Sequence, residues 1–355
     1  MKFLKRVLFS SLAGVLSLTL LSSPANAVVG GQDATGSPIV VALLIDTGES
    51  RLGACSGALW KPRIVVTAAH CVVRAGSTQV VLPSQVLVYR PGVNRSNTRP
   101  SAVGTYIVSP AGYRNSQDGF VNSDDIAFIV LDVELATPAI SRLASEAEVS
   151  AMIASGNSLP FFGYGLTTFQ GEVSPIPLTL NQNPLSYQGS NKYLYGRTAR
   201  GSGACQGDSG GPVVGTFQDQ LLLIGPIAGG SGEPCFPSIP DRFVISSVAS
   251  AYQSLANEAL ALAGYSADIA ISKARPKLKR NATFQARNLV TRRLNASVNS
   301  SSQVRIIRSR SNKSGVCSTT QTSLRTGRKG TCTVTFSVKD KGKKARTFTT
   351  TFRVR

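Results

Sequence analysis

The chain has 355 residues, of which 42% are hydrophobic, so it is long enough and apolar enough to bury a large core and to form more than one domain. It carries 38 Lys and Arg against 18 Asp and Glu, a net charge of +20 at pH 7, and a single His. One histidine and six dispersed cysteines argue against the common His and Cys metal centres, and we expect neither a metal nor a cofactor.

The excess positive charge lies at one end of the sequence. From residue 266 onward, 22 Lys and Arg are accompanied only by Asp268 and Asp340, whereas the first 265 residues carry 16 side chains of each sign. Regions with such different surfaces are expected to have different roles. We therefore divide the chain into a neutral domain over 28–265, a basic linker over 266–280 and a basic module over 281–355.

The first 27 residues have the features of a secretory signal peptide. Basic residues precede an apolar run from Val7 to Leu21, and Ala25-Asn26-Ala27 fits a signal peptidase site. The alternative is a retained membrane anchor, but the apolar run is shorter than the roughly 20 residues that a spanning helix needs. We expect cleavage after Ala27, a secreted protein, and no transmembrane segment once the signal is removed.

Export would place the six cysteines in an oxidising compartment, where an even number indicates disulfide bonds. Free thiols or a metal site are the alternatives, and the dispersed positions disfavour the metal site. The positions suggest three pairs, which are Cys55 with Cys71, Cys205 with Cys235, and Cys317 with Cys332.

Short apolar and β-branched runs, broken by Gly, Pro, Asn and Ser, dominate the sequence after residue 28. A helix is predicted over 246–264, where apolar residues recur at helical intervals and Gly264 provides a stop. The density of short strands is typical of an all-β barrel or sandwich. Strands are expected at 39–45, 63–66, 79–82, 85–89 and 124–132 and, after a connection over 136–158, at 159–165 and 221–227.

The basic region after the linker also has the pattern of half-exposed strands. The segment 339–343 is a good hairpin turn between its last two strands, and Cys317 and Cys332 would close a loop. These features predict a small β-sandwich-like module. Its strands are expected at 282–290, 303–307, 332–338 and 347–354.

One serine is placed among glycines that allow a sharp backbone turn, in the stretch from Gly203 to Pro212. A serine hydroxyl is a weak nucleophile unless a general base and oxyanion donors lie close to it. The only histidine, His70, follows an apolar run and precedes Cys71. Ser209 and His70 are therefore the candidate nucleophile and base, although an ordinary glycine-rich turn and a structural histidine are the alternatives.

Four motifs in order give the chain a resemblance to the trypsin/chymotrypsin-family serine proteases, from Val28 to about Gly264. The resemblance implies two antiparallel β-barrels with the active site between them and a C-terminal helix, a chymotrypsin-like fold to which the basic module is added. The motifs are Val28-Val29-Gly30-Gly31, Thr67-Ala68-Ala69-His70-Cys71, Asp125-Ile126-Ala127 and Gly207-Asp208-Ser209-Gly210-Gly211-Pro212.

The resemblance implies a role for each motif residue. Ser209 would attack a peptide carbonyl, His70 would be its general base, and Asp125 would orient the imidazole. Asp124 is the rival carboxylate, but Asp125 directly precedes Ile-Ala, as the family pattern requires. The amides of Gly207 and Ser209 would form the oxyanion hole.

The family also implies an activation pair and two of the disulfide roles. Asp208 would bind the α-ammonium group of Val28 once that residue becomes the N-terminus. Because Val28 directly follows the expected signal cleavage site, signal removal alone would activate the enzyme. The Cys55–Cys71 disulfide would brace the loop of His70, and the Cys205–Cys235 disulfide would brace the substrate pocket.

Substrate preference is less directly encoded. Gly203, followed by Ala204, stands where trypsins carry the acidic selector, which implies a roomy apolar pocket unless another carboxylate enters it. Asp241 aligns with the opposite pocket wall and could attract Lys or Arg, although capping a turn or pairing with Arg242 is the alternative. Ala228, Gly229 and Gly230 match the strand that pairs with the substrate backbone.

The expected partner is a protein or peptide substrate. The basic module most simply suggests adhesion to an anionic surface such as a cell-wall polymer, an acidic glycan or nucleic acid, with a solvated basic face as the alternative. Few aromatic residues interleave its charges, which disfavours base stacking. Competing functions for the whole chain are a catalytically inactive binding protein with the protease fold and an esterase on the same scaffold.

Overall fold

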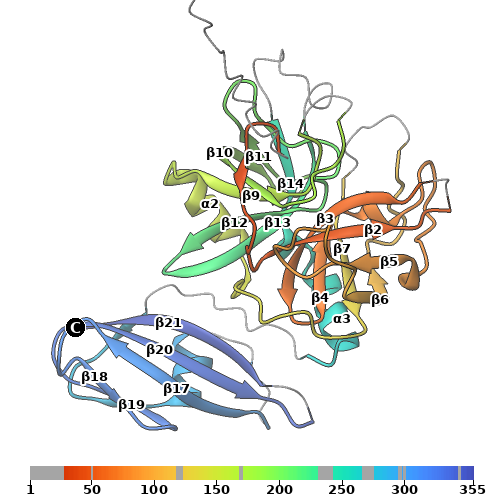
Figure 1. Ribbon diagram of the computed structural model, residues 1–355. Helices are drawn as coiled ribbons and strands as arrows, with labels where there is room; N and C mark the ends of the chain where they lie inside the picture. Colours follow the sequence, from red (N-terminus) through yellow and green to blue (C-terminus); the bar gives the residue numbers. More distant parts are fainter. Residues whose placement is uncertain are drawn as a thin grey trace, which may run out of the picture.

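The computed structural model describes residues 28–48, 51–116, 123–167, 171–230, 243–265, 276–294, 298, 301–342 and 345–355. Strands dominate this part of the chain, as expected, and they form two barrels and a separate pair of sheets (Figure 1). None of the helices in these ranges is long and apolar enough to cross a membrane.

The first barrel is a closed ring in the order β2-β3-β4-β7-β6-β5. Its strands are rich in Val, Ile and Leu, whose branched side chains suit a half-buried pleated surface. All five residues of β7 are buried, because one face of the strand fills the barrel and the other packs between the barrels. The strands are β2 (Val40–Ile45), β3 (Gly53–Lys61), β4 (Ile64–Thr67), β5 (Val86–Val88), β6 (Ala102–Val108) and β7 (Ala127–Leu131).

The second barrel closes in the order β10-β11-β14-β13-β12-β9, with β9 returning to β10. Two short strands extend it, β1 (Gln32–Asp33) on β10 and β8 (Arg142–Leu143) on β13. The ring strands are β9 (Leu159–Gly163), β10 (Leu178–Gln188), β11 (Tyr193–Arg197), β12 (Pro212–Phe217), β13 (Gln220–Gly230) and β14 (Phe243–Ser247).

A large apolar cluster packs between the two barrels. Trp60 and Phe128 of the first barrel share it with Leu223 of the second and with Leu260 of the helix α3 (Gln253–Leu262). Burial of such side chains stabilises the fold by roughly 2 kcal/mol each. The expectation of a double antiparallel barrel with a C-terminal helix, in the chymotrypsin-like arrangement, is confirmed.

Helical segments account for three corrections to the sequence-based elements. The helix predicted over 246–264 begins only at Gln253, after the end of β14 and a 3-10 turn η2 (Ala249–Tyr252). The connection over 136–158 contains a second helix, α2 (Glu146–Ala154). The strand expected at 79–82 is reduced to an isolated bridge between Val80 and Val73, followed by the 3-10 turn η1 (Pro83–Gln85).

The basic module consists of two sheets around one core (Figure 1). Phe336 and Phe352 are fully buried at its centre, and the Cys317–Cys332 disulfide joins the two sheets. The four-stranded sheet has the order β15-β21-β20-β17 and the three-stranded sheet has the order β16-β19-β18. The strands are β15 (Lys277–Leu278), β16 (Thr283–Gln285), β17 (Gln303–Ser311), β18 (Cys317–Thr319), β19 (Ser323–Thr326), β20 (Gly330–Lys339) and β21 (Arg346–Val354).

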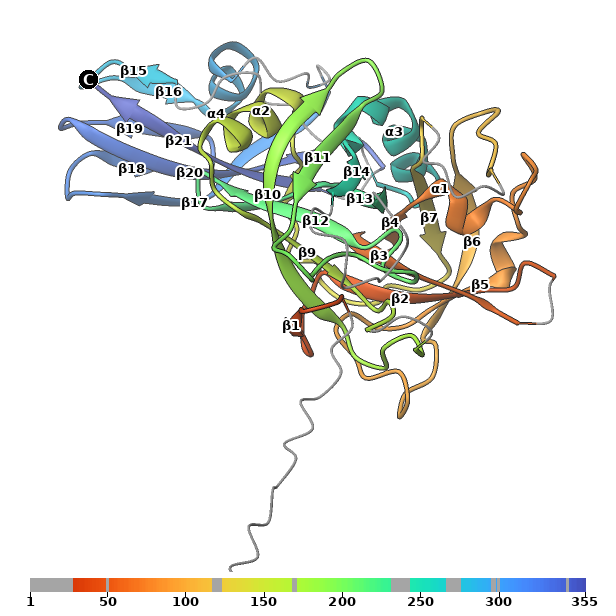
Figure 2. The same cartoon turned by 90° about the horizontal axis from the view of Figure 1, so that it is seen from above.

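One predicted strand of the module is shorter than expected. The segment 282–290 forms only the three-residue β16 before it turns into the helical segments α4 (Ala286–Asn288) and η3 (Leu289–Arg293). The last two strands, β20 and β21, form the predicted antiparallel hairpin. The β12–β13 hairpin of the second barrel reaches toward this pair in both views (Figures 1 and 2), and the Gln220 side chain donates a hydrogen bond to the Thr349 carbonyl at 2.7 Å.

Candidate active site

Asp125 binds His70 at two points. One carboxylate oxygen lies 2.7 Å from Nδ1 of the imidazole, and the other accepts the backbone N–H of His70 at 2.9 Å. His70 lies in the short helix α1 (Ala69–Val72) that follows β4, and Asp125 lies just before β7, which pairs with β4. The strand pairing therefore brings together two residues that are 55 positions apart in the sequence.

The two side chains differ in exposure. The carboxylate of Asp125 is 1% exposed, whereas the imidazole of His70 is 27% exposed. Burial lowers the pKa of His70, but the charge and hydrogen bond of Asp125 raise it, and the net effect is a raised pKa. The arrangement holds the ring with Nδ1 toward the carboxylate and leaves Nε2 available to another group.

The second barrel supports Asp125 from its other side. Ser247, a fully buried residue at the end of β14, donates its hydroxyl to the Asp125 carbonyl at 2.7 Å. The buried phenol of Tyr113 lies beside the carboxylate, and burial followed by the charge of Asp125 raises the pKa of that phenol. Asp125 is thus held by elements of both barrels.

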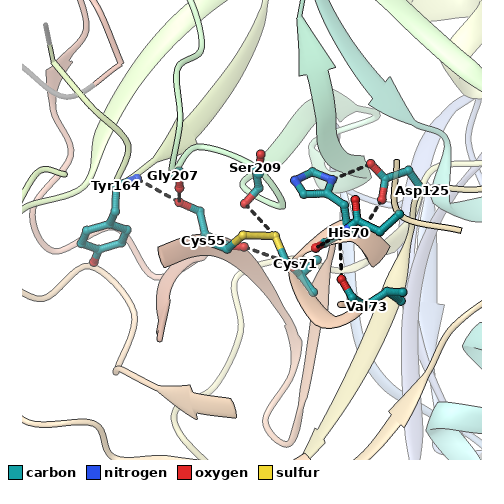
Figure 3. The surroundings of a disulfide bond; sticks show 11 residues. Cys55, His70, Cys71, Val73, Asp125, Tyr164, Gly207 and Ser209 are labelled. Atoms are coloured by element: carbon teal, nitrogen blue, oxygen red, sulfur yellow. Dashed lines mark hydrogen bonds and ion pairs between the residues drawn. A yellow bond between two sulfur atoms is a disulfide. The ribbon is translucent and has the colours of Figure 1, made fainter. Parts of the chain in front are cut away.

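Figure 3 shows the imidazole of His70 between Asp125 and Ser209. Ser209 lies on a loop of the second barrel, and its carbonyl accepts the backbone N–H of Ser56 in β3 at 2.8 Å. The hydroxyl of Ser56 donates to the Gly207 carbonyl at 2.7 Å. Ser56 therefore connects the serine loop to the first barrel through two hydrogen bonds, one from its N–H and one from its hydroxyl.

The backbone conformation near Ser209 requires glycine at two positions, 207 and 210. Gly207 has a φ of +91° and Gly210 a φ of +81°, both in the left-handed region that favours glycine. A Cβ on Gly210 would lie 2.0 Å from the hydroxyl oxygen of Thr67, so no side chain fits there. Within the described ranges, the N–H groups of Gly207 and Ser209 donate to no acceptor, so both are available to a ligand.

The carboxylate of Asp208 is fully buried behind this loop. It accepts the N–H groups of Gly165 and Cys205, each at 2.8 Å. Burial raises its pKa to about 7, although the two backbone hydrogen bonds act in the opposite direction. A buried carboxylate with only neutral donors favours either a proton or a nearby cation.

The predicted N-terminal segment packs close to this region. Val28 is fully buried in the core of the second barrel. Its neighbour Val29 forms a bridge with Gly203, whose N–H donates to the Val29 carbonyl at 3.0 Å. Residues 1–27 lie outside the described residues, as does the expected cleavage site.

The rival carboxylate, Asp124, points to a different partner. It forms an ion pair with Lys192 at 2.6 Å, and both side chains are more than one third exposed. Both residues have positive φ values, +70° for Asp124 and +60° for Lys192. Lys192 also lies over the Tyr252 ring at 4.7 Å, so the pair connects the two barrels beside Asp125.

The structure describes most of the predicted pocket residues but not the predicted selector. Ala228, Gly229 and Gly230 form the end of β13, and Ala204 packs into the same apolar cluster as Ile227. The N–H of Gly210 donates to the Ile227 carbonyl at 2.8 Å, which ties the serine loop to this strand. Asp241 and Cys235 lie outside the described residues.

Two predicted disulfides are confirmed, Cys55–Cys71 and Cys317–Cys332. Cys205 is also disulfide-bonded. Among the described residues, the group that could approach a metal ion is Cys55, His70 and Cys71. Because its two sulfur atoms are bonded to each other, they are not thiolates that could bind a metal.

Two closed six-stranded barrels with a C-terminal helix define a chymotrypsin-fold protein. The Trypsin family model matches residues 28–243, which is more than half of the chain. The chain therefore belongs to the trypsin family, and this membership supports a serine protease function.

Known relatives agree with the family model. Trypsin alpha-4 of Lucilia cuprina is 29% identical over 222 residues, covering 58% of this chain and 78% of the relative. Chymotrypsin-like elastase family member 1 of Canis lupus familiaris is 30% identical over 202 residues, covering 52% of this chain and 74% of the relative. Trypsin beta of Drosophila erecta is 28% identical over 238 residues, covering 62% and 85%.

Four residues of the site have roles that the sequence did not predict: Ser56, Tyr113, Lys192 and Ser247. Ser56 had a local signal, because it is a polar residue within the apolar run 53–60, and the structure shows it fully buried. A buried hydroxyl needs a partner, and here the partner is the serine loop. Lys192 and Ser247 act across the two barrels and have no comparable signal in the sequence around them.

Proposed function

We propose that this protein is a secreted serine endopeptidase that cleaves peptide bonds through Ser209, His70 and Asp125. The observation that carries the proposal is the two-point contact of Asp125 with His70, in a trypsin-family chain whose one histidine lies between Asp125 and Ser209 (Figure 3). A carboxylate bound to Nδ1 keeps the proton on that nitrogen, so that Nε2 can accept the proton of a serine hydroxyl.

The reaction follows from these positions. Ser209 attacks the scissile carbonyl carbon while His70 takes the hydroxyl proton, and His70 then delivers that proton to the leaving amine. Collapse of the tetrahedral species leaves an acyl group on Ser209. A water molecule, deprotonated by His70, releases the acyl group as a carboxylate and regenerates the hydroxyl. Asp125 stabilises the imidazolium that exists between the proton transfers.

The amides of Gly207 and Ser209 would bind the oxyanion of each tetrahedral species. Their availability supports this role, since neither donates elsewhere within the described ranges. Loss of one such donor costs about 3 kcal/mol of transition-state stabilisation. The hydrogen bond from Ser56 to the Gly207 carbonyl orients the same peptide chain and would help to keep the donors in position.

Activation would follow removal of residues 1–27. The new α-ammonium group of Val28 would supply the cation that the buried Asp208 carboxylate favours. The burial of Val28 and the bridge between Val29 and Gly203 support this proposal, because they hold the segment next to the serine loop. Secretion is proposed on the signal-like features of the first 27 residues.

A preference for Lys or Arg before the cleaved bond is proposed on the sequence alone. Gly203 and Ala204 bring no charge to the pocket, so the selector would be Asp241. Kinetics on paired peptides that differ only in Arg or Phe at this position test the idea. Preference for Phe that survives Asp241→Ala would exclude Asp241 as the selector.

The basic module is proposed to hold the enzyme on an anionic surface. Its charge supports this role, since residues 281–355 hold 17 Lys and Arg with Asp340 as their one acidic residue. Hydrolysis of a peptide substrate by the secreted protein, with no hydrolysis by Ser209→Ala, tests the enzymatic part. Hydrolysis by neither protein would favour the inactive binding protein, and equal hydrolysis by both would exclude Ser209 as the nucleophile. Cleavage of esters but not of peptides would favour an esterase.

A further inference from the structure

The arginines of β17 share one face only because the strand contains a bulge. In a regular strand, side chains alternate, so Arg305 would point away from Arg308 and Arg310. Here the pairing with β20 shifts by one residue between Ile306 and Arg308. Because of this extra residue, Arg308 and Arg310 lie on the same side of the sheet as Arg305. The three residues lie opposite Ser337, Thr335 and Thr333, in that order.

This side is the outer face of the four-stranded sheet. The alternate residues of β20, such as Val334 and Phe336, are buried in the core of the module. All three arginines are exposed, and in the described part of the chain none of their guanidinium groups pairs with a carboxylate. The bulge keeps all three arginines out of the core and gathers them on one exposed face, where their cations are available to an anionic ligand.

Hydroxyl groups cover the middle of the same face. The outward positions of β20 are Thr331, Thr333, Thr335 and Ser337, and those of β21 are Thr347, Thr349, Thr351 and Arg353. Thr333 pairs with Thr351 and Thr335 with Thr349, each at 2.9 Å between the hydroxyl oxygens. Each pair uses one O–H as donor and leaves the other O–H and several lone pairs for a ligand.

Cations also lie along the edge of the hydroxyl rows that is opposite β17. Arg353 lies at the end of the β21 row, and Lys277 of β15 lies opposite it. A hollow of about 540 Å³ opens there. It is lined by Lys329, Gly330, Thr331, Arg353, Val354 and Arg355. The face thus presents hydroxyls between two cationic margins, and we name it the hydroxyl–arginine face (Arg305, Arg308, Arg310, Thr331, Thr333, Thr335, Ser337, Thr347, Thr349, Thr351 and Arg353).

We propose that the hydroxyl–arginine face binds a linear acidic polysaccharide. Guanidinium groups recognise carboxylate, sulfate or phosphate groups in a bidentate manner, and rows of hydroxyls exchange hydrogen bonds with sugar hydroxyls. Nucleic acid fits less well, because Phe336 and Phe352 point into the core and cannot stack on bases. The inference rests on the proposal that the module binds an anionic surface, and it names the face and the ligand class.

The first test measures how much the three arginines of the face contribute to the binding of acidic polymers. Full-length secreted protein carrying Ser209→Ala, which prevents self-cleavage, is titrated against polygalacturonate and dextran sulfate at physiological salt, with neutral dextran as a blank. The variant R305Q/R308Q/R310Q should bind at least about tenfold more weakly, because three charge-assisted contacts are lost. The matched control R292Q/K313Q/R325Q removes the same charge from exposed positions outside the four-stranded sheet and should bind within about threefold of the parent.

The second test separates a sugar ligand from any polyanion. Replacing the four paired threonines with valine (T333V, T335V, T349V and T351V) keeps the branched shape and the strand preference but removes the hydroxyls. Binding of polygalacturonate should weaken by about tenfold or more, while binding of polyglutamate, which carries carboxylates without sugar hydroxyls, should change by less than about threefold. Thermal unfolding and circular dichroism of each variant verify that the module remains folded.

The outcomes are distinct. If the parent binds none of the anionic polymers, both the anionic-surface proposal and this inference fail, while the peptidase proposal stands on its own assay. If the parent binds but the two charge variants weaken equally, or the valine variant binds polygalacturonate as well as the parent does, only this inference fails. Tighter binding of single-stranded DNA than of either polysaccharide would also overturn it.

Discussion

The buried carboxylate of Asp208 leads to a specific pH dependence of stability. While Val28 remains joined to Ala27, its nitrogen is an uncharged amide, and in the described part of the chain no cation forms an ion pair with Asp208. Burial then raises the pKa of Asp208 to about 7. In the unfolded chain the same group titrates near its ordinary value of about 3.9.

The sign and size of the effect follow from these values. Between about pH 4 and pH 7 the folded chain holds a proton that the unfolded chain has released, so stability falls as the pH rises through this range. A pKa difference of about 3 units corresponds to about 4 kcal/mol of unfolding free energy. Once Val28 carries a free α-ammonium group, the charged carboxylate gains a partner and most of this loss should disappear.

Two chains that differ only before Val28 test this reasoning. Both carry Ser209→Ala; one retains several residues ahead of Val28, and the other begins at Val28. Urea unfolding at pH 4 and pH 8 should show that the extended chain loses about 4 kcal/mol more than the mature chain. Titration of His70 occurs in both chains and cancels in the comparison.

Asp208→Asn supplies the control, because asparagine has no proton to release in this range. In that background the two chains should have the same pH dependence. Equal losses of stability from pH 4 to pH 8 in the extended and mature chains with Asp208 would show that the Val28 α-ammonium group does not stabilise the charged Asp208 carboxylate.

Three further predictions concern separate contacts. Asp125→Asn should lower kcat/KM about 10⁴-fold at neutral pH, and steady-state kinetics should also show the acidic limb of the pH profile at lower pH, because the charge that raises the pKa of His70 is gone. Lys192→Met should cost at most about 1 kcal/mol of stability, since its pair with Asp124 is partly exposed, and a double-mutant cycle with Asp124→Asn measures that coupling. Replacing Cys317 and Cys332 with alanine should lower the unfolding free energy of the module by about 3 kcal/mol, as expected for a 15-residue loop, without reducing peptidase activity.

The sequence predicted best where a side chain depends on its immediate neighbours. The glycines around Ser209 are needed for the positive φ values there, and the carboxylate before Ile126 lies next to a strand whose pattern is fully apolar. Because these requirements involve neighbouring residues, they produce short motifs that can be recognised in the sequence. The double barrel was predictable for the same reason, because each short strand carries its own apolar pattern.

Features that depend on pairing between distant segments were not predictable. The ion pair of Asp124 with Lys192 joins residues 68 positions apart, and nothing near Asp124 indicates a partner. The bulge after Ile306 depends on the register with β20, which the sequence of β17 alone does not specify. The missed helix α2 is different, because Ser145 and Glu148 form a capping box that could have been recognised.

The central claim is that Ser209 is the nucleophile and that His70 activates it. Labelling with a fluorophosphonate probe, followed by mass spectrometry of the digested protein, tests this claim most directly. We expect one label for each chain, on Ser209, with labelling lost in Ser209→Ala and greatly slowed in His70→Ala. A protein that cleaves peptides while the label lies on another residue, or that retains peptidase activity after Ser209→Ala, would contradict it.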